Sequence, residues 1–149
     1  MLELRTFGTV ELEWPDGRSS RSLLDKPKRL ALLAVLGARS PGEAVHRSRL
    51  ISLLWPGGSP SDGRAALNTT LSRLRRDLGS DLFRTSSSEV VGLAPAHIRS
   101  DVGRFVEAVE SDRHRAALEL HRGRFLDGFC LGDNRPFEEW AEKRRDTYR

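Results

Sequence analysis

Four leucines recur at intervals of four, three and four residues along one stretch of the chain: Leu67, Leu71, Leu74 and Leu78. An α-helix turns by about 100° per residue, so these leucines form a single apolar stripe. The opposite side of the same helix carries small, polar and basic side chains: Ala65, Thr69, Ser72, Arg73 and Arg76. Gly79 follows the last leucine, where a left-handed glycine commonly ends a helix. The pattern predicts a two-faced helix over residues 63–78.

The residues before this helix predict short strands followed by two further helices. Alternation of apolar and polar residues indicates short antiparallel strands, over 2–7, 9–14 and 21–24. Pro27 suits the first turn of a helix that ends near Gly37, and a second helix covers about residues 47–55. No Ser or Thr directly precedes the second helix, so we expect Ser48 or solvent to satisfy its first amides. Residues 56–62 are rich in proline, glycine and serine, which predicts a loop.

The residues after the two-faced helix predict a β-hairpin. Apolar stretches flank the serines at 86–88, so we expect two strands and a turn within residues 82–93. Three amphipathic helices in so short a segment must share one core, with the strands at its flanks and Trp55 inside it. Strands, two helices, a basic third helix and a hairpin, in that order, predict a winged helix-turn-helix.

From Ser100 the pattern changes and predicts helices, with an apolar turn over residues 123–129. Candidate caps predict two helices, one starting after Ser100-Asp101 and one after Ser111-Asp112, and a third helix begins at Phe137. We therefore expect an α+β protein in two parts. A winged-helix domain covers residues 1–97, and residues 98–149 form the start of a small all-α domain that is incomplete.

Charge is distributed unevenly between these two parts. The whole chain has a formal net charge of +4 at pH 7. Residues 1–98 hold 14 lysines and arginines against 10 acidic residues, which gives +4, whereas residues 99–149 hold 11 of each, which gives zero. The excess positive charge accompanies the basic helix, and this suits an anion-binding module joined to an interaction module.

Several function classes lack the residues they need. The sequence has no glycine-rich phosphate loop, no nucleophile elbow and no cluster of Cys and His ligands, so we expect neither an enzyme nor a cofactor nor a metal site. His114 and His121 share one helical face without a third ligand, and Cys130, the single cysteine, is expected to be a small buried apolar residue. The start of the chain is not a signal peptide and no long apolar run follows, so we expect a cytoplasmic protein without membrane association.

The polar face of the 63–78 helix has the properties of a DNA-reading surface. A guanidinium group can donate two hydrogen bonds to a guanine edge or can bind a phosphate, so Arg73 and Arg76 are the main candidates for DNA contact. Arg64 lies on the flank, where a phosphate contact and a solvated charge are equally compatible with the pattern, and Asn68 could bind adenine. A solvated basic face predicts the same residues, because arginine also favours helices. The place of this helix, third before a hairpin, favours DNA.

Several short motifs also occur along the chain in a specific order. They are Leu4-Arg5-Thr6-Phe7-Gly8, Arg49-Leu50-Ile51 with Leu54-Trp55-Pro56, Leu71-Ser72-Arg73-Leu74-Arg75-Arg76 with Leu78-Gly79, and Gly123-Arg124-Phe125-Leu126 with Glu138-Glu139-Trp140. Their order and spacing resemble the SARP type of bacterial regulator, the Streptomyces antibiotic regulatory proteins. In that family an OmpR-type winged helix is followed by a bacterial transcriptional activator domain (BTAD), whose helices are similar to tetratricopeptide repeats. The resemblance covers essentially the whole chain.

This resemblance implies a transcription regulator, with activation as the expected outcome, that binds duplex DNA at promoters. The 63–78 helix would be the recognition helix, and the residues meeting bases and phosphates would be Asn68, Thr69, Ser72, Arg73 and Arg76. The hairpin would be the wing near the minor groove, where Ser87 could donate to a phosphate. Arg47 could touch a phosphate beside the first amides of the second helix. The 56–62 loop or the helical half would face RNA polymerase, and a homodimer could bind direct repeats.

A second hypothesis keeps the fold and changes the ligand. Glu89 stands in the predicted wing, where an acidic residue would repel phosphates. The C-terminal half also holds a group of aromatic residues: Phe125, Phe129, Phe137 and Trp140. These features favour a protein-interaction module whose winged helix no longer reads DNA.

Overall fold

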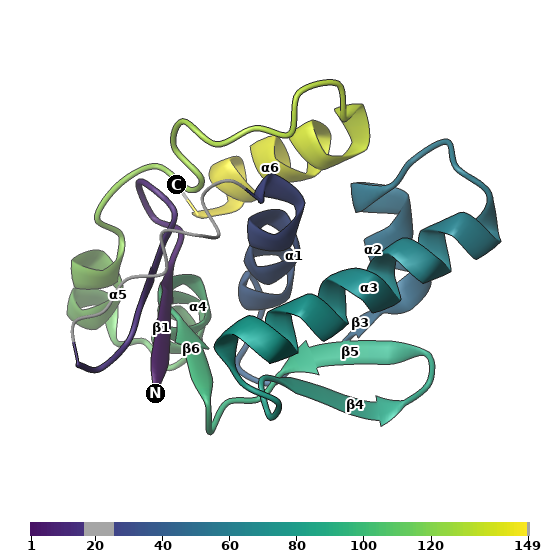
Figure 1. The fold of residues 1–149 in the computed structure, drawn as a ribbon. Helices are drawn as coiled ribbons and strands as arrows, with labels where there is room; N and C mark the ends of the chain where they lie inside the picture. Colours follow the sequence, from purple (N-terminus) through teal and green to yellow (C-terminus); the bar gives the residue numbers. More distant parts are fainter. Residues whose placement is uncertain (17–25, 149) are drawn as a thin grey trace.

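The computed structural model describes residues 1–16 and 26–148, and it has an α+β fold, as the pattern predicted. The elements are β1 (Leu2–Arg5), β2 (Glu11–Glu13), α1 (Pro27–Gly37), β3 (Val45–His46), α2 (Arg47–Leu54), α3 (Pro60–Leu78), β4 (Phe83–Ser87), β5 (Val90–Leu93), β6 (Ile98–Ser100), α4 (Asp101–Glu110), α5 (His114–Leu120) and α6 (Arg135–Tyr148). Figure 1 shows α1 at the centre, α6 above it, and α3 with the β4–β5 hairpin below. The strand expected over 21–24 lies outside the described residues.

The first two helices begin close to the predicted positions. Pro27 occupies the first turn of α1, and α2 runs from Arg47 to Leu54. No side chain caps α2: His46 occupies the cap position in extended conformation, and its side chain makes no capping bond. Of the two expected partners for the first amides, Ser48 does not serve, and solvent is the one that stays a prediction. Trp55 is only half-buried, at the edge of the core, with the Lys28 ammonium 5.3 Å from its ring centroid.

Helix α3 starts three residues earlier than the leucine stripe alone indicated. Ser59 caps it, because its hydroxyl accepts a hydrogen bond from the Asp62 amide at 3.1 Å, and Pro60 suits the first turn. Gly63 is buried where α3 crosses α2, and a Cβ there would lie 2.4 Å from Ile51 Cγ2. At the other end Gly79 has a positive φ of 137° but a ψ of 139°, so it ends the helix in a glycine-favouring conformation other than the left-handed helical one expected.

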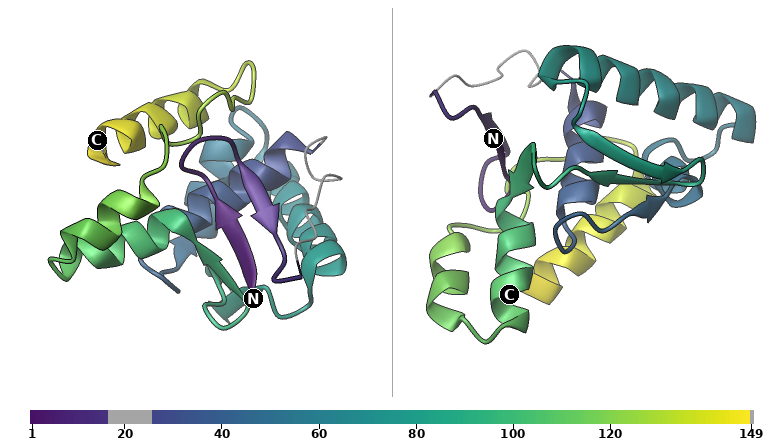
Figure 2. Two further views of the ribbon diagram at one scale, coloured as in Figure 1. Left: turned by 90° about the vertical axis from the view of Figure 1, so that its left-hand side faces the viewer. Right: turned by 90° about the horizontal axis from the view of Figure 1, so that it is seen from below.

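Two small sheets flank the three helices. The first has the order β2-β1-β6, in which β2 is antiparallel to β1, as predicted, and β6 is parallel to it. The second has the order β3-β5-β4, and its β4–β5 hairpin is the predicted wing. The hairpin runs beside α3 in Figure 1 and in the right-hand view of Figure 2.

One hydrophobic core cluster contains side chains from both ends of the chain. Its largest fully buried members are Leu2, Leu4, Leu32, Leu33, Leu50, Leu54, Leu67, Leu71, Leu74, Phe125 and Phe137. Strand β6 and the start of α4 join the two ends directly: the Asp101 carboxylate accepts hydrogen bonds from the Thr6 amide at 3.0 Å and the Phe7 amide at 2.9 Å. Residues 98–148 therefore pack against the preceding part of the fold and share its core.

The C-terminal segment departs from the sequence expectations at three points, the first of which is strand β6, where an all-α segment was expected. Ser100 caps α4 as predicted, accepting from the Gly103 amide at 2.8 Å, but neither Ser111 nor Asp112 caps α5. Ser111 is the C-terminal cap residue of α4, and Asp112 takes a positive φ of 58° in the turn, so α5 starts only at His114. Cys130 is exposed, not buried. The loop turns the side chains of Phe129 and Leu131 toward the core, and Cys130, which lies between them, faces outward.

Candidate nucleic-acid interface

Helix α3 separates its side chains into two faces. Leu67, Leu71 and Leu74 are at most 1% exposed, and Leu78 is 7% exposed, so the leucine stripe lies in the core. The other face is open to solvent and carries seven of the residues singled out by the sequence: Arg64, Ala65, Asn68, Thr69, Ser72, Arg73 and Arg76. Because the apolar stripe lies in the core and α3 packs against α2, the polar face is held in one orientation.

Acidic groups lie at the two ends of this face. Asp62 is in the first turn of α3, and Asp77 is in the last. The Asp77 carboxylate is drawn toward α1, where it pairs with the Arg29 guanidinium at 3.3 Å. It also accepts from Arg76 Nε at 3.4 Å, although Arg76 keeps 71% of its side chain exposed. The central part of the face, around Thr69 and Arg73, is therefore cationic and polar.

The arginines of α3 differ in what they contact. The Arg75 guanidinium lies 5.6 Å from the ring centroid of Phe83, so this side chain holds the hairpin to the helix through a cation–π contact. Among the described residues, neither Arg64 nor Arg73 has a hydrogen-bond or ion-pair partner. These two guanidinium groups keep their donors available to a ligand.

The wing places a short polar turn beside α3. Ser87 Oγ accepts a hydrogen bond from the Glu89 amide at 3.2 Å, so the Ser87 hydroxyl organises the turn and keeps its own proton for another acceptor. Glu89 is exposed, which leaves a carboxylate on the wing. Strand β4 also exposes Arg84, one basic side chain on the same hairpin.

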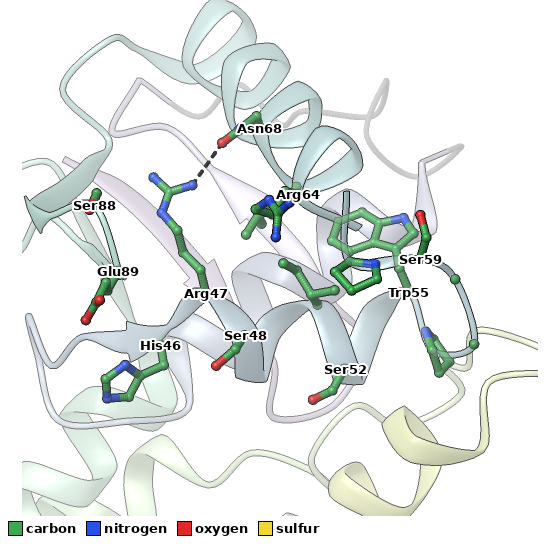
Figure 3. A pocket seen from close by; sticks show the side chains of 16 residues that line it. His46, Arg47, Ser48, Ser52, Trp55, Ser59, Arg64, Asn68, Ser88 and Glu89 are labelled. Atoms are coloured by element: carbon green, nitrogen blue, oxygen red, sulfur yellow. Dashed lines mark hydrogen bonds between the residues drawn. The ribbon is translucent and has the colours of Figure 1, made fainter. Parts of the chain in front are cut away.

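An open cleft of about 1060 Å³ separates α2, the first half of α3 and the wing turn. Figure 3 shows its lining residues, with Arg47 rising from the start of α2 toward Asn68 on α3. Arg47 Nη1 donates to Asn68 Oδ1 at 2.9 Å, and the Arg47 backbone amide donates to the Glu89 carbonyl at 2.8 Å. Arg47 Nε is buried and has no hydrogen-bond partner in the described part of the chain. The sequence analysis treated Arg47 and Asn68 as separate candidates on two different helices, whereas the structure joins them by a hydrogen bond.

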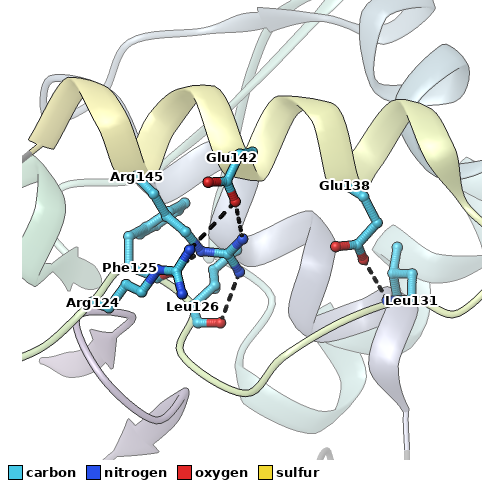
Figure 4. A network of polar contacts seen from close by, with 7 residues as sticks. All are labelled: Arg124, Phe125, Leu126, Leu131, Glu138, Glu142 and Arg145. Carbon is cyan, nitrogen blue, oxygen red and sulfur yellow. Dashed lines mark hydrogen bonds and ion pairs between the residues drawn. The ribbon is translucent and has the colours of Figure 1, made fainter.

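The polar groups of α6 serve a different purpose. Arg145 Nε donates to the Phe125 carbonyl at 2.8 Å and Nη2 donates to the Leu126 carbonyl at 3.1 Å, while Nη1 pairs with Glu142 at 3.0 Å (Figure 4). Leu126 has a positive φ of 54°, so the guanidinium fixes a turn of unusual backbone conformation. This network belongs to the scaffold of the fold.

Two other features, a cluster of metal ligands and a membrane-spanning helix, are not found in the parts of the chain that the structure describes. No three His, Cys, Asp or Glu side chains within residues 1–16 and 26–148 are grouped as metal ligands would be. Within the same ranges no helix combines the length and the apolar character that crossing a membrane requires.

Comparison with known proteins finds a similar solved structure but no match to a family model or to a curated protein. The structure is similar to that of EmbR from Mycobacterium tuberculosis, which was solved in complex with a low-affinity phosphopeptide. The match has a TM-score of 0.67 and 27% sequence identity, and it covers 99% of this chain and 42% of EmbR. The chain therefore spans less than half the length of that protein, and the similarity supports a SARP-like winged-helix fold.

Proposed function

We propose that this chain is the DNA-binding part of a SARP-type transcription regulator, which activates transcription by binding promoter DNA. Helix α3 enters the major groove, and the wing lies near the adjoining minor groove. The observation that carries the proposal is the face of α3: an exposed cationic and polar surface, backed by a buried leucine stripe and flanked by a hairpin. The similarity of the fold to that of a regulator, EmbR, supports it.

The exposed side chains fall into two roles. Arg73 is unpartnered among the described residues and lies centrally, so it binds a guanine edge, with Thr69 and Ser72 contacting neighbouring bases or phosphates. The flanking residues that position the protein on the backbone of the DNA are Arg47, Arg64, Arg76 and Ser87, whereas Asn68 contacts a base edge. No catalytic step and no cofactor is part of this function.

The remaining surface serves protein partners. Residues 56–62 are all exposed, although the last three of them form the first turn of α3 and not a loop, and we assign this segment to RNA polymerase. Residues 98–149 form the beginning of a BTAD-like domain, and a homodimer on direct repeats places two α3 helices on one face of the duplex. Such a regulator works in the cytoplasm, at the nucleoid.

Binding to duplex DNA at several salt concentrations tests the proposal. Each neutralised phosphate contributes about −0.9 to the slope of log affinity against log salt, so three contacts give a slope of about −2.7. The measurement uses fluorescence anisotropy with the whole chain and a pool of randomised duplexes at low salt. Absence of binding at low salt, or binding without salt dependence, would contradict the proposal.

The alternative is a protein-interaction module that does not read DNA. The exposed carboxylate of Glu89 on the wing favours it, because an acid near phosphates is repulsive. Its aromatic support is weaker than the sequence indicated, since Phe125, Phe137 and Trp140 are at most 7% exposed and are therefore closed to a partner. Capture of a defined protein partner, together with no mobility shift of any duplex, would favour this alternative.

A further inference from the structure

The hydrogen bond between Arg47 and Asn68 connects the start of α2 with the middle of the proposed recognition helix. The two residues are 21 positions apart in sequence, and Arg47 Nη1 lies 2.9 Å from Asn68 Oδ1. Figure 3 shows the guanidinium pointing at the amide from across the cleft. Asn68 is exposed, so its side chain faces whatever occupies the groove beside α3.

The chemistry of the pair fixes which way the amide of Asn68 faces. A guanidinium group has five donors and no acceptor, so it can face only the oxygen of the amide and never the nitrogen. Asn68 Oδ1 is turned into the cleft, where it accepts a hydrogen bond from the positively charged Arg47 guanidinium. The Nδ2 group, with two donors, is left toward solvent, and it has no partner among the described residues.

Arg47 is itself held in place. Its backbone amide donates to the Glu89 carbonyl of the wing turn at 2.8 Å, and its Nε is buried. Its side chain is only partly accessible, so the guanidinium has little freedom to turn away from Asn68. The orientation of one amide on α3 is therefore set jointly by α2 and the wing.

This orientation restricts the bases that Asn68 can read. An asparagine binds adenine through a pair of hydrogen bonds, donating to N7 and accepting from the N6 amino group. Here the accepting oxygen lies against Arg47, whose positive charge repels an approaching amino donor. Guanine O6 and N7 and thymine O4 are acceptors only, and the free Nδ2 donors suit them.

We propose that Arg47 is a positioning residue that makes Asn68 a dedicated hydrogen-bond donor, so that Asn68 selects guanine or thymine over adenine at one position of the target DNA. The inference rests on the proposed DNA-binding function and adds the base class that this residue recognises. It replaces the adenine contact that the sequence alone indicated for Asn68.

Selection from a pool of randomised duplexes tests the proposal, using the whole chain and three variants. Asn68→Ala identifies the base pair that Asn68 reads, as the position where preference disappears. At that position the wild-type protein is expected to favour guanine or thymine over adenine by about fivefold. Arg47→Met frees the amide to rotate, so adenine is expected to be bound at least as well as guanine or thymine there. Asn68→Asp removes the donors, and the preference is expected to move to cytosine, whose N4 amino group donates.

Arg49→Met is the matched control, because it removes the same charge from the same helix at an exposed position without a contact to Asn68. It is expected to leave base preference unchanged. If Arg47→Met weakens all duplexes equally, or if the wild-type protein prefers adenine at the Asn68 position, the inference is wrong while the proposed function stands. If the wild-type protein binds no duplex, both are wrong.

A measurement on the protein without DNA tests whether the Arg47–Asn68 hydrogen bond forms, independently of its effect on base preference. In an NMR spectrum the side-chain amide signals of Asn68 are expected to move in Arg47→Met and to stay in place in Arg49→Met. Unmoved signals in Arg47→Met would show that the pair does not form in solution, and this would overturn the inference even where DNA binding is intact.

Discussion

Helices α3 and α6 carry the same number of basic residues and use them in opposite ways. Helix α3 has four arginines and two aspartates, whereas α6 has three arginines, one lysine, three glutamates and one aspartate. The net formal charge is therefore +2 on α3 and zero on α6. The two helices therefore differ in the number and position of their acidic residues and not in the number of their basic residues.

On α6 acidic residues lie one helical turn from basic residues and form ion pairs with them. Arg145 pairs with Glu142 and Arg135 with Glu139, and Arg145 also binds two backbone carbonyls, which leaves its side chain only 12% exposed. On α3 the acids stand at the ends, so the central arginine meets solvent. A paired and partly buried arginine stabilises the fold, and an unpaired exposed arginine remains available for a ligand.

The largest expected effect is on stability, from Arg145→Met. The variant removes the guanidinium from the carbonyls of Phe125 and Leu126, and hydrogen bonds from a charged donor contribute about 1.5–3 kcal/mol each. We expect the free energy of unfolding to fall by about 3 kcal/mol, measured by urea denaturation. Arg135→Met is the control, because its pair is exposed and such pairs contribute about 0.3–0.5 kcal/mol. Equal losses in the two variants would contradict a scaffold role for Arg145.

A second stability effect is expected at Asn134, which connects α6 to α2. Its Oδ1 accepts from the Phe137 amide at 3.1 Å, and its Nδ2 donates to the Leu53 carbonyl at 2.9 Å. Asn134→Ala removes both and is expected to cost about 2 kcal/mol. Asn134→Ser retains a capping oxygen but cannot reach α2, so its loss should be about 1 kcal/mol in the same denaturation experiment. If serine restores full stability, the contact with α2 contributes nothing.

Local patterns in the sequence were sufficient to predict the three helices of the N-terminal part and the wing. The leucine stripe and Pro27 specify α1 and α3 through residues that are neighbours in the chain. Strand β6 could not be predicted in this way, because three residues carry almost no periodicity and their partner strand begins at Leu2. Cys130 was placed wrongly for a related reason: apolar neighbours do not determine which side chain of a loop turns inward.

The candidate site was predictable only as a set of exposed residues. Helical spacing placed Arg73 and Thr69 on one open face, and this needs no tertiary information. The contacts of individual side chains depend on other elements. Arg75 makes a cation–π contact with Phe83 of the wing, and Asn68 accepts a hydrogen bond from Arg47 of α2. Neither contact can be predicted from the residues that are neighbours in sequence.

The third prediction concerns Arg73, the exposed arginine of α3 that is compared with the paired arginines of α6. Arg73→Ala removes an exposed side chain, so the free energy of unfolding is expected to change by less than about 0.5 kcal/mol. Affinity for the best duplex from the randomised pool is expected to fall by about 1–3 kcal/mol, and affinity for unrelated duplexes by less. Anisotropy titrations on both duplexes measure the difference. An equal loss on both would make Arg73 a phosphate contact, and a large loss of stability would remove the distinction between α3 and α6.

The smallest effect is expected at the end of α6, where Tyr148 donates a hydrogen bond to the Ala38 carbonyl at 2.8 Å. Burial raises the pKa of the Tyr148 hydroxyl above its ordinary value of about 10, because the charged phenolate is poorly solvated there. The folded protein therefore retains this proton at a pH where the unfolded chain releases it. The resulting stability is complete below about pH 10 and is lost as the pH rises through the higher folded pKa.

Tyr148→Phe tests whether the hydrogen bond to the Ala38 carbonyl holds the end of α6 in place. The variant is expected to lose about 1 kcal/mol of stability at neutral pH, since the Ala38 carbonyl is left without its donor. The difference from the wild-type protein should shrink as the pH rises above about 10. Tyr148 is the single tyrosine of the chain, so tyrosinate absorbance during alkaline titration follows this hydroxyl alone. Titration at the ordinary pKa in the folded protein would mean that the hydroxyl is solvated and that α6 is not held to α1 at this point.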